Sequence, residues 1–269
     1  MSLLKNHFKP ARRIGGIISL SFLILFAVVF FGWNYSNATV INKSSSNNTL
    51  QNGLVGWWTF DGKDVTANTT TDRSGQGNNG TRVGTTTPVV GRIGQAMKFG
   101  PGGGNYIKTV DLDLSGNFAF SAWVKLNAVG SGQIIINKTL TNTNYPSYAL
   151  YILSDNKVYC WFATANSPAG WGTPSGSAKT LTVGIWYHIA CSHDGTNIRE
   201  YINGSMDANS PIARTGTAYN SPDNLWIGAD NNSLTPFYDS PINGVIDDVR
   251  VYNRALSPVE IQQLYRMGK

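Results

Sequence analysis

Short runs of alternating apolar and polar residues follow one another from residue 53 onward. In the run FAFSAWVKL, Phe118 and Phe120 lie on one side while Ala119 and Ser121 lie on the other, because successive strand residues point to opposite faces. Turn residues such as Asp194-Gly195 separate the runs and predict hairpins. The predicted strands lie at 53–60, 95–100, 105–110, 118–126, 132–139, 147–153, 157–165, 185–195, 198–204, 224–229 and 244–252. This spacing predicts an all-β, two-sheet sandwich.

A helical pattern occurs only after residue 256, in SPVEIQQLYRMGK. Ser257 is the expected N-cap, Pro258 occupies the first helical position and Glu260 the third, which together make a capping box. The apolar stripe that could pack on the sandwich consists of Ile261, Leu264 and Tyr265. We therefore expect one short C-terminal helix.

The last predicted strand, GVIDDVRVY, contains two adjacent aspartates. Strict alternation places Asp247 on the face of Val249 and Val251, and Asp248 on the face of Arg250. A carboxylate among core valines is costly unless it has a partner. Asp247 is thus expected to bind a cation or a hydrogen-bond donor, and Asp248 to be a surface charge.

The N-terminal 52 residues differ from the rest. Residues 1–13 are basic, residues 14–33 form an uncharged apolar run, and residues 34–52 form a polar linker before the domain at 53–269. An apolar helix of 20 residues matches a bilayer core, whereas Ser36-Asn37-Ala38 resembles a signal-peptidase site. The run is therefore a membrane anchor or a cleaved signal, and either reading predicts an extracytoplasmic domain.

The charge of the chain gives little support for nucleic-acid binding. The net charge is +6, but four basic residues lie in the leader, and removing them from +6 leaves +2 for the remainder. A hydrophobic fraction of 41% is enough for a folded core.

Seven segments occur in an order that resembles a known family: GLVGWWTFDG, DRSGQGNNGT, GRIGQAMKFG, FAFSAWVK, GIWYHIACSHDG, EYINGS and IDDVRVYNRALSPVEI. They are similar to concanavalin A-like lectin/glucanase domains, and within these to laminin-G-like jelly-roll domains, over residues 53–267. The resemblance implies a two-sheet antiparallel jelly roll. It is less specific for function, because the family includes sugar binders, adhesive modules and accessory domains of enzymes.

The chain lacks the residues that a hydrolase of this fold would need. Glycosidases of this fold use a pair of carboxylates, usually glutamates. The only glutamates here are Glu200, on a predicted hairpin strand, and Glu260, in the capping box, and neither belongs to a Glu-x-Asp-x-x-Glu block. His188 and His193 lie on one strand with opposite parity and so face different sides. We expect a binding module rather than an enzyme.

A calcium site is one reading of the acidic residues. The resemblance implies that the first and last long strands pair, which would bring Asp61 near Asp247, with the loop that carries Asp72 close by. Such oxygen ligands suit a structural Ca²⁺. In the alternative reading, Asp61 and Asp72 accept backbone hydrogen bonds in turns, and Asp247 pairs with an arginine such as Arg82 or Arg92.

Two cysteines and several loop aromatics complete the candidates. Cys160 and Cys191 could form a disulfide in an exported protein, or remain small buried thiols. Trp57, Trp58, Trp123 and Trp186 fall in strands and are read as core or sheet-face residues. The aromatics expected in polar loops, as sugar-stacking residues or as rim residues packed on the sandwich, are Trp171, Tyr145, Phe237 and Tyr238.

These patterns favour an exported, membrane-tethered module that recognises carbohydrate at the cell surface. The alternative is a structural or adhesive domain that binds a surface protein. A glycoside hydrolase is the least favoured reading because the carboxylate pair is missing.

Overall fold

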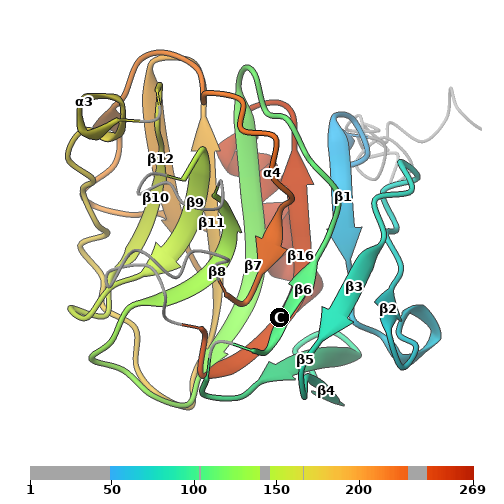
Figure 1. Cartoon of the computed structure of the whole chain (residues 1–269). Helices are drawn as coiled ribbons and strands as arrows, with labels where there is room; N and C mark the ends of the chain where they lie inside the picture. The colour runs from blue at the N-terminus through green and yellow to red at the C-terminus, as the bar shows by residue number, and fades with distance from the viewer. Residues whose placement is uncertain (1–48, 103, 140–145, 166, 230–240) are drawn as a thin grey trace, which may run out of the picture. The chain divides into compact units, whose positions relative to one another are not determined.

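The computed structural model describes residues 49–269 except 103, 140–145, 166 and 230–240. These residues form two antiparallel sheets that pack face to face (Figure 1). The predicted anchor or signal at 14–33 lies outside the described residues. Within the part that the structure describes, no helix is both long and apolar enough to span a membrane.

Sheet A contains nine strands in the described part of the chain. They are β1 (Leu54–Trp58), β4 (Thr87–Val90), β5 (Gln95–Phe99), β7 (Phe118–Leu126), β11 (Trp186–His193), β12 (Asn197–Ile202), β13 (Ser205–Met206), β14 (Ile212–Ala213) and β16 (Gly244–Tyr252). The main path runs β13-β12-β11-β7-β16-β5-β4, while β1 also pairs with β16 and β14 with β12. The central position of β16 follows from its length and its fully buried sequence.

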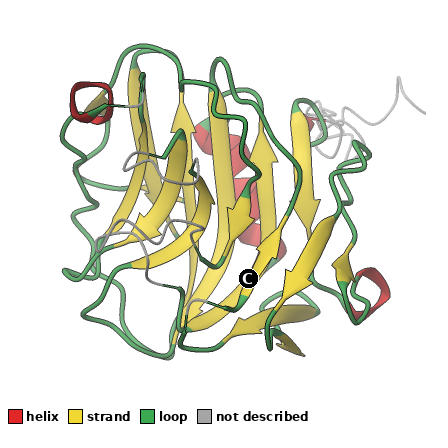
Figure 2. Cartoon of the chain, viewed as in Figure 1, coloured by secondary structure: helices red, strands yellow, loops and turns green. Residues whose placement is uncertain are grey.

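Sheet B contains seven strands in the described residues, in the order β10-β9-β8-β15-β6-β3-β2. They are β2 (Thr69–Thr70), β3 (Gly80–Val83), β6 (Tyr106–Lys108), β8 (Gln133–Lys138), β9 (Tyr148–Ile152), β10 (Val158–Phe162) and β15 (Trp226–Ile227). The helices named in the described residues are η1 (Gly62–Asp64), α3 (Pro168–Trp171) and α4 (Pro258–Met267), and strands dominate this part of the chain (Figure 2). The predicted all-β sandwich with a short C-terminal helix is confirmed.

The core lies between the two sheets and is rich in aromatic rings. Phe118 of β7 meets Phe162 of β10 edge to face, with ring centroids 5.6 Å apart, and Phe120 packs on Tyr148 at 5.3 Å. These rings bury large apolar areas, which is the main stabilising contribution to such a sandwich.

Helix α4 packs on the outer face of sheet A. Ser257 and Glu260 form the predicted capping box, and Ile261 and Leu264 are buried against the sheet. Tyr265 stacks on Trp123 of β7 with ring centroids 5.6 Å apart. The helix therefore gives sheet A a second, outer layer of apolar packing.

A β-bulge in β16 changes which side chains face the core. The pairing with β7 shifts between Asp247 and Arg250, and Asp248 adopts a left-handed φ of 49°, as an extra residue in a strand requires. Val249 and Val251 consequently lie in the core. Asp247 lies opposite Trp123, on the outer face. The prediction that Asp247 shares the valine face is wrong, because strict alternation does not hold across a bulge.

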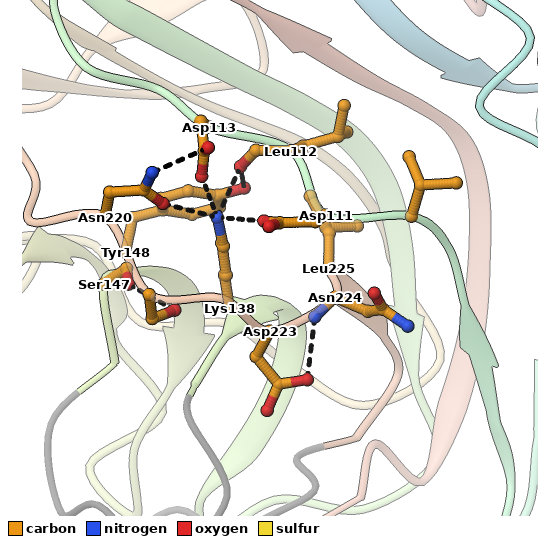
Figure 3. A network of polar contacts seen from close by, with 12 residues as sticks. Asp111, Leu112, Asp113, Lys138, Ser147, Tyr148, Asn220, Asp223, Asn224 and Leu225 are labelled. Atoms are coloured by element: carbon orange, nitrogen blue, oxygen red, sulfur yellow. Dashed lines mark hydrogen bonds and ion pairs between the residues drawn. The ribbon is translucent and has the colours of Figure 1, made fainter.

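Lys138, at the end of β8, is the centre of a polar network (Figure 3). Its side chain is 1% exposed, and its Nζ forms ion pairs with Asp111 and Asp113. Nζ also donates to the carbonyl oxygen of Leu112 at 3.2 Å, which accepts the hydroxyl of Tyr148 at 2.7 Å as well. The buried ammonium thus fixes the segment 111–113 over the end of the core.

Replacing Lys138 with methionine is expected to lower the free energy of unfolding by about 2 kcal/mol. The aliphatic stem is retained, but Asp111 and Asp113 lose their shared cation. Because both aspartates are partly exposed, water compensates part of the loss. Urea unfolding measures the change, with the exposed Lys98→Met variant as control. Equal stability of the two variants would contradict a structural role for this network.

Candidate functional site

A cavity of about 410 Å³ opens on the outer side of sheet A. The cavity lies where β16 changes its pairing partner. Residues Gly244–Ile246 pair with β5, whereas Val249–Tyr252 pair with β1. Asp247 and Asp248 occupy the junction between these two pairings. The walls include the apolar side chains Leu50, Ile93 and Met267 and the polar or aromatic side chains Trp57, Asp61, Asp247, Asp248 and Arg250.

Asp247 and Asp61 hold the turn between β4 and β5 from two sides. Asp247 Oδ2 accepts the backbone N–H groups of Arg92 and Ile93 at 2.7 and 2.8 Å. Asp61 Oδ1 accepts the backbone N–H of Gln95 at 2.8 Å. Close packing against Asp247 requires glycine at position 91, since a Cβ there would lie 2.6 Å from Oδ2. Each carboxylate therefore has a structural partner in the backbone of the turn.

The other oxygen of Asp247 has no partner. Its side chain is fully buried, and Oδ1 has no hydrogen-bond donor among the described residues. Burial raises the pKa of the Asp247 carboxyl to about 7, and the nearby charges of Asp248 and Asp61 act in the same direction, while the two backbone N–H groups oppose them. A cation or a hydrogen-bond donor in the cavity would stabilise the ionised form.

Trp57, Asp248 and Arg250 form a second cluster in the same wall. The indole Nε1 of Trp57 donates to Asp248 Oδ1 at 2.6 Å, and Arg250 pairs with Asp248 at 3.2 Å. The Arg250 guanidinium lies 4.3 Å from the centroid of the Trp57 ring, a cation–π contact. Asp248 is only 5% exposed, so its prediction as a surface charge is wrong, because the bulge turns it toward Trp57.

The three carboxylates predicted to hold calcium do not form one cluster. Asp61 and Asp247 line the cavity, but Asp72 accepts the backbone N–H groups of Trp57, Ser74 and Asn78 and the hydroxyl of Ser74. In the described part of the chain, no group of three or more His, Cys, Asp or Glu side chains is arranged to hold a metal ion. Calcium binding stays a prediction, which thermal melts in calcium and in chelator would test.

The predicted ligand aromatics are only partly described. Trp171 is 5% exposed and belongs to the core cluster, and its carbonyl oxygen accepts the indole N–H of Trp161. It therefore fits the alternative of a rim residue packed on the sandwich, at the end of the short helix α3. Tyr145, Phe237 and Tyr238 lie outside the described residues.

Cys160 and Cys191 form a disulfide that joins the two sheets. Cys160 belongs to β10 of sheet B and Cys191 to β11 of sheet A, with their Cα atoms 6.1 Å apart. Both residues are fully buried. The bridge therefore crosses the core, away from the cavity on the outer face.

Neither glutamate lies in the cavity. Glu200 is fully buried, and its Oε1 accepts the backbone N–H of Cys160 at 2.8 Å. Glu260 caps α4 and pairs with Arg254 at 2.7 Å. His188 and His193 face opposite sides of β11, with His188 against Trp123 and His193 against Phe162. The described glutamates and histidines thus have structural partners in separate places.

The sequence pattern did not identify Trp57, Asp248 or Arg250 as site residues. The prediction that Trp57 is a core or sheet-face residue is correct for its strand. It does not indicate that β1 ends beside the cavity. The adjacent aspartates followed by an arginine were the available signal, because an acidic pair and a cation in a buried strand need a polar neighbourhood.

Comparisons with known proteins agree on the fold. A laminin G family model, described as the concanavalin A-like lectin/glucanases superfamily, matches residues 101–262. Domain 4 of AbnA, a GH43 extracellular arabinanase from Geobacillus stearothermophilus solved in complex with arabinotriose, is 23% identical with a TM-score of 0.57, over 79% of this chain and 98% of that domain.

Two further structures have similar folds. The Trypanosoma rangeli sialidase in complex with sialic acid is 16% identical with a TM-score of 0.59, over 79% of this chain but only 32% of the sialidase. The binding domain of Paraclostridial Mosquitocidal Protein 1 is 17% identical with a TM-score of 0.62, over 80% of this chain and 52% of that one. At these identities the similarities show the fold alone.

Proposed function

The chain belongs to the concanavalin A-like lectin/glucanases superfamily, and on that premise we propose that it is a carbohydrate-binding module without catalytic activity. The observation that carries the proposal is the composition of the cavity wall. The half-buried indole of Trp57 lies there beside Asp247 and Arg250, each of which has one buried polar atom without a hydrogen-bond partner among the described residues.

This combination suits a sugar. The C–H face of a pyranose or furanose packs on an aromatic ring, and its hydroxyl groups both donate and accept hydrogen bonds. The carboxylates of the wall can accept from such hydroxyls, and the guanidinium of Arg250 can donate to one. A cavity of about 410 Å³ is within the usual range for small-ligand sites.

The comparison with the arabinanase supports a glycan ligand. Domain 4 of that enzyme was solved with arabinotriose, and this chain covers 98% of the domain. Domains with a similar fold also occur within enzymes, as in the sialidase. A non-catalytic role here is supported by the structural duties of Asp61 and Asp247, whose oxygens hold the β4–β5 turn.

The proposal includes a location outside the cytoplasm. The buried disulfide between Cys160 and Cys191 supports it, because disulfides persist in oxidising compartments. The basic and apolar leader at 1–33 supports export, with attachment to the membrane if the leader is retained.

Screening the purified full chain, kept in mild detergent, against a broad panel of neutral, cationic and anionic glycans tests the function. We expect at least one glycan class to bind with a Kd below about 1 mM, as for a specific pocket. The screen is run in calcium and in chelator, which also tests whether calcium supports binding. Failure across all classes would reject the carbohydrate proposal and favour the protein-binding alternative.

A further inference from the structure

The polar wall of the cavity carries more negative than positive charge. Three carboxylates line it, from Asp61, Asp247 and Asp248, against the single guanidinium of Arg250. That guanidinium is paired with Asp248. Among the described residues, no lysine or arginine side chain forms an ion pair with Asp61 or Asp247. Backbone N–H groups are thus the donors that these two carboxylates have in the described part of the chain.

Asp247 lacks a hydrogen-bond donor for one of its two carboxylate oxygens among the described residues. It is fully buried, its Oδ2 is occupied by two backbone N–H groups, and its Oδ1 has no donor in the described part of the chain. A buried acceptor without a donor costs about 1–3 kcal/mol, and more when it is charged. A ligand that supplies a charged donor at this wall would recover that cost.

The same wall disfavours anionic sugars. A carboxylate-bearing sugar would be placed near Asp61 and Asp247, and like charges at close range repel strongly in a partly buried site. A metal ion is also a poor match, because the described residues hold no group of three or more ligating side chains. An ammonium group needs only a few acceptors and can accompany an apolar ring.

We infer that the cavity binds an amino sugar, a pyranose that carries a protonated amine, with its ammonium group toward the Asp61 and Asp247 carboxylates and its ring against Trp57. The inference rests on the proposed function and specifies its ligand class. Arg250 and Asp248 then have a positioning role, since they fix the Trp57 ring through the cation–π contact and the indole hydrogen bond.

Titration calorimetry of the full chain in detergent with four tetrasaccharides tests the inference. The probes are β-1,4-linked glucosamine, its N-acetylated form, the neutral glucose analogue cellotetraose, and tetragalacturonate as the anion. We expect the amine form to bind at least about tenfold more tightly than each of the others, because charge-assisted hydrogen bonds are the strong ones. This preference should weaken at high salt.

Two cavity variants test whether the preference for the amine arises at this site. Asp247→Asn and Asp61→Asn are each expected to abolish most of the tenfold preference for the amine, and Asp61 is partly exposed, so that its variant should fold even if Asp247→Asn does not. The exposed Asp155→Asn variant, in the β9–β10 turn of sheet B, should retain the preference. Non-specific attraction of a polycation is disfavoured by the net charge of +6.

The other outcomes of the titrations overturn the inference, and one of them also rejects the proposed function. If the acetylated or neutral tetrasaccharide binds as tightly as the amine, the inference is overturned while the carbohydrate proposal stands. If the amine binds equally to the wild type and both cavity variants, its site is elsewhere and the inference is also overturned. If no saccharide binds, both the inference and the proposed function fail.

Discussion

The double variant Cys160→Ala/Cys191→Ala is expected to lose about 3–4 kcal/mol of stability relative to the oxidised wild type. The disulfide closes a loop of 31 residues, and the chain-entropy description of such a loop gives a loss of this size. For a domain of this length, each kcal/mol corresponds to about 2–4 °C in Tm, so the variant should melt about 6–16 °C lower. The bridge also connects sheet A to sheet B through the centre of the core.

Scanning calorimetry of the wild type, the double variant and the reduced wild type measures this effect. The reduced wild type retains both sulfur atoms, so it separates the loss of the cross-link from the loss of buried volume. We expect both forms without the bridge to melt well below the oxidised protein. If the double variant melts within about 2 °C of the oxidised wild type, the bridge contributes little to stability.

The wild type is expected to lose free energy of unfolding as the pH rises. The Glu200→Gln variant is expected to lose less, by an amount on the order of 4 kcal/mol. Glu200 lies inside the core, and its Oε2 has no hydrogen-bond partner among the described residues. Burial raises the pKa of the Glu200 carboxyl to about 8, and the charge of Asp207 adds to this, although the N–H of Cys160 acts against it. Glutamine has no proton to lose in this range.

The direction of the effect follows from the raised pKa. In the unfolded chain the carboxyl ionises near its ordinary value of 4.5, whereas in the folded protein it stays protonated until about pH 8. The stability contributed by Glu200 is therefore complete below pH 4.5 and is lost as the pH rises through 8. Asp247, with its pKa raised from 3.8 to about 7, gives a pH dependence of the same sign over a lower pH range, and this remains in the variant.

Urea unfolding of the wild type and Glu200→Gln from pH 4 to pH 9 measures this difference. The wild type should lose stability steadily over the range, and the variant should lose less. Glu260→Gln is the matched control, because the pKa of Glu260 is lowered and its contribution disappears only under acid conditions. Parallel curves for the wild type and Glu200→Gln above pH 5 would show that Glu200 is not held neutral in the core.

Local sequence signals predicted those parts of the fold that depend on local chemistry. The capping box at Ser257 and Glu260 fixed the start of α4, since a cap depends on residues three positions apart. Alternation predicted β7 well, because Phe118 and Phe120 face the core while Ala119 faces α4. The pairing of the first and last long strands came from the family resemblance and is confirmed by the antiparallel pairing of β1 with β16.

The site was harder to predict because it depends on a departure from regularity. The bulge at Asp248 has no glycine to announce it, and one extra residue reverses the facing of every side chain before it. Asp247 was therefore placed in the core, and the contact between Trp57 and Asp248 was missed. Trp171 looked like an exposed loop aromatic, but packing across distant segments buries it.

The central claim is that sugar binds at the Trp57 cavity. The most direct test is titration of the tightest glycan from the screen into the wild type, Trp57→Ala and Trp186→Ala. Trp186 is the matched control, a half-buried tryptophan on the same sheet that does not line the cavity. We expect at least a tenfold loss of affinity for Trp57→Ala, as for an aromatic anchor of a binding site, and no loss for Trp186→Ala. Unchanged binding by a folded Trp57→Ala variant would contradict the central claim.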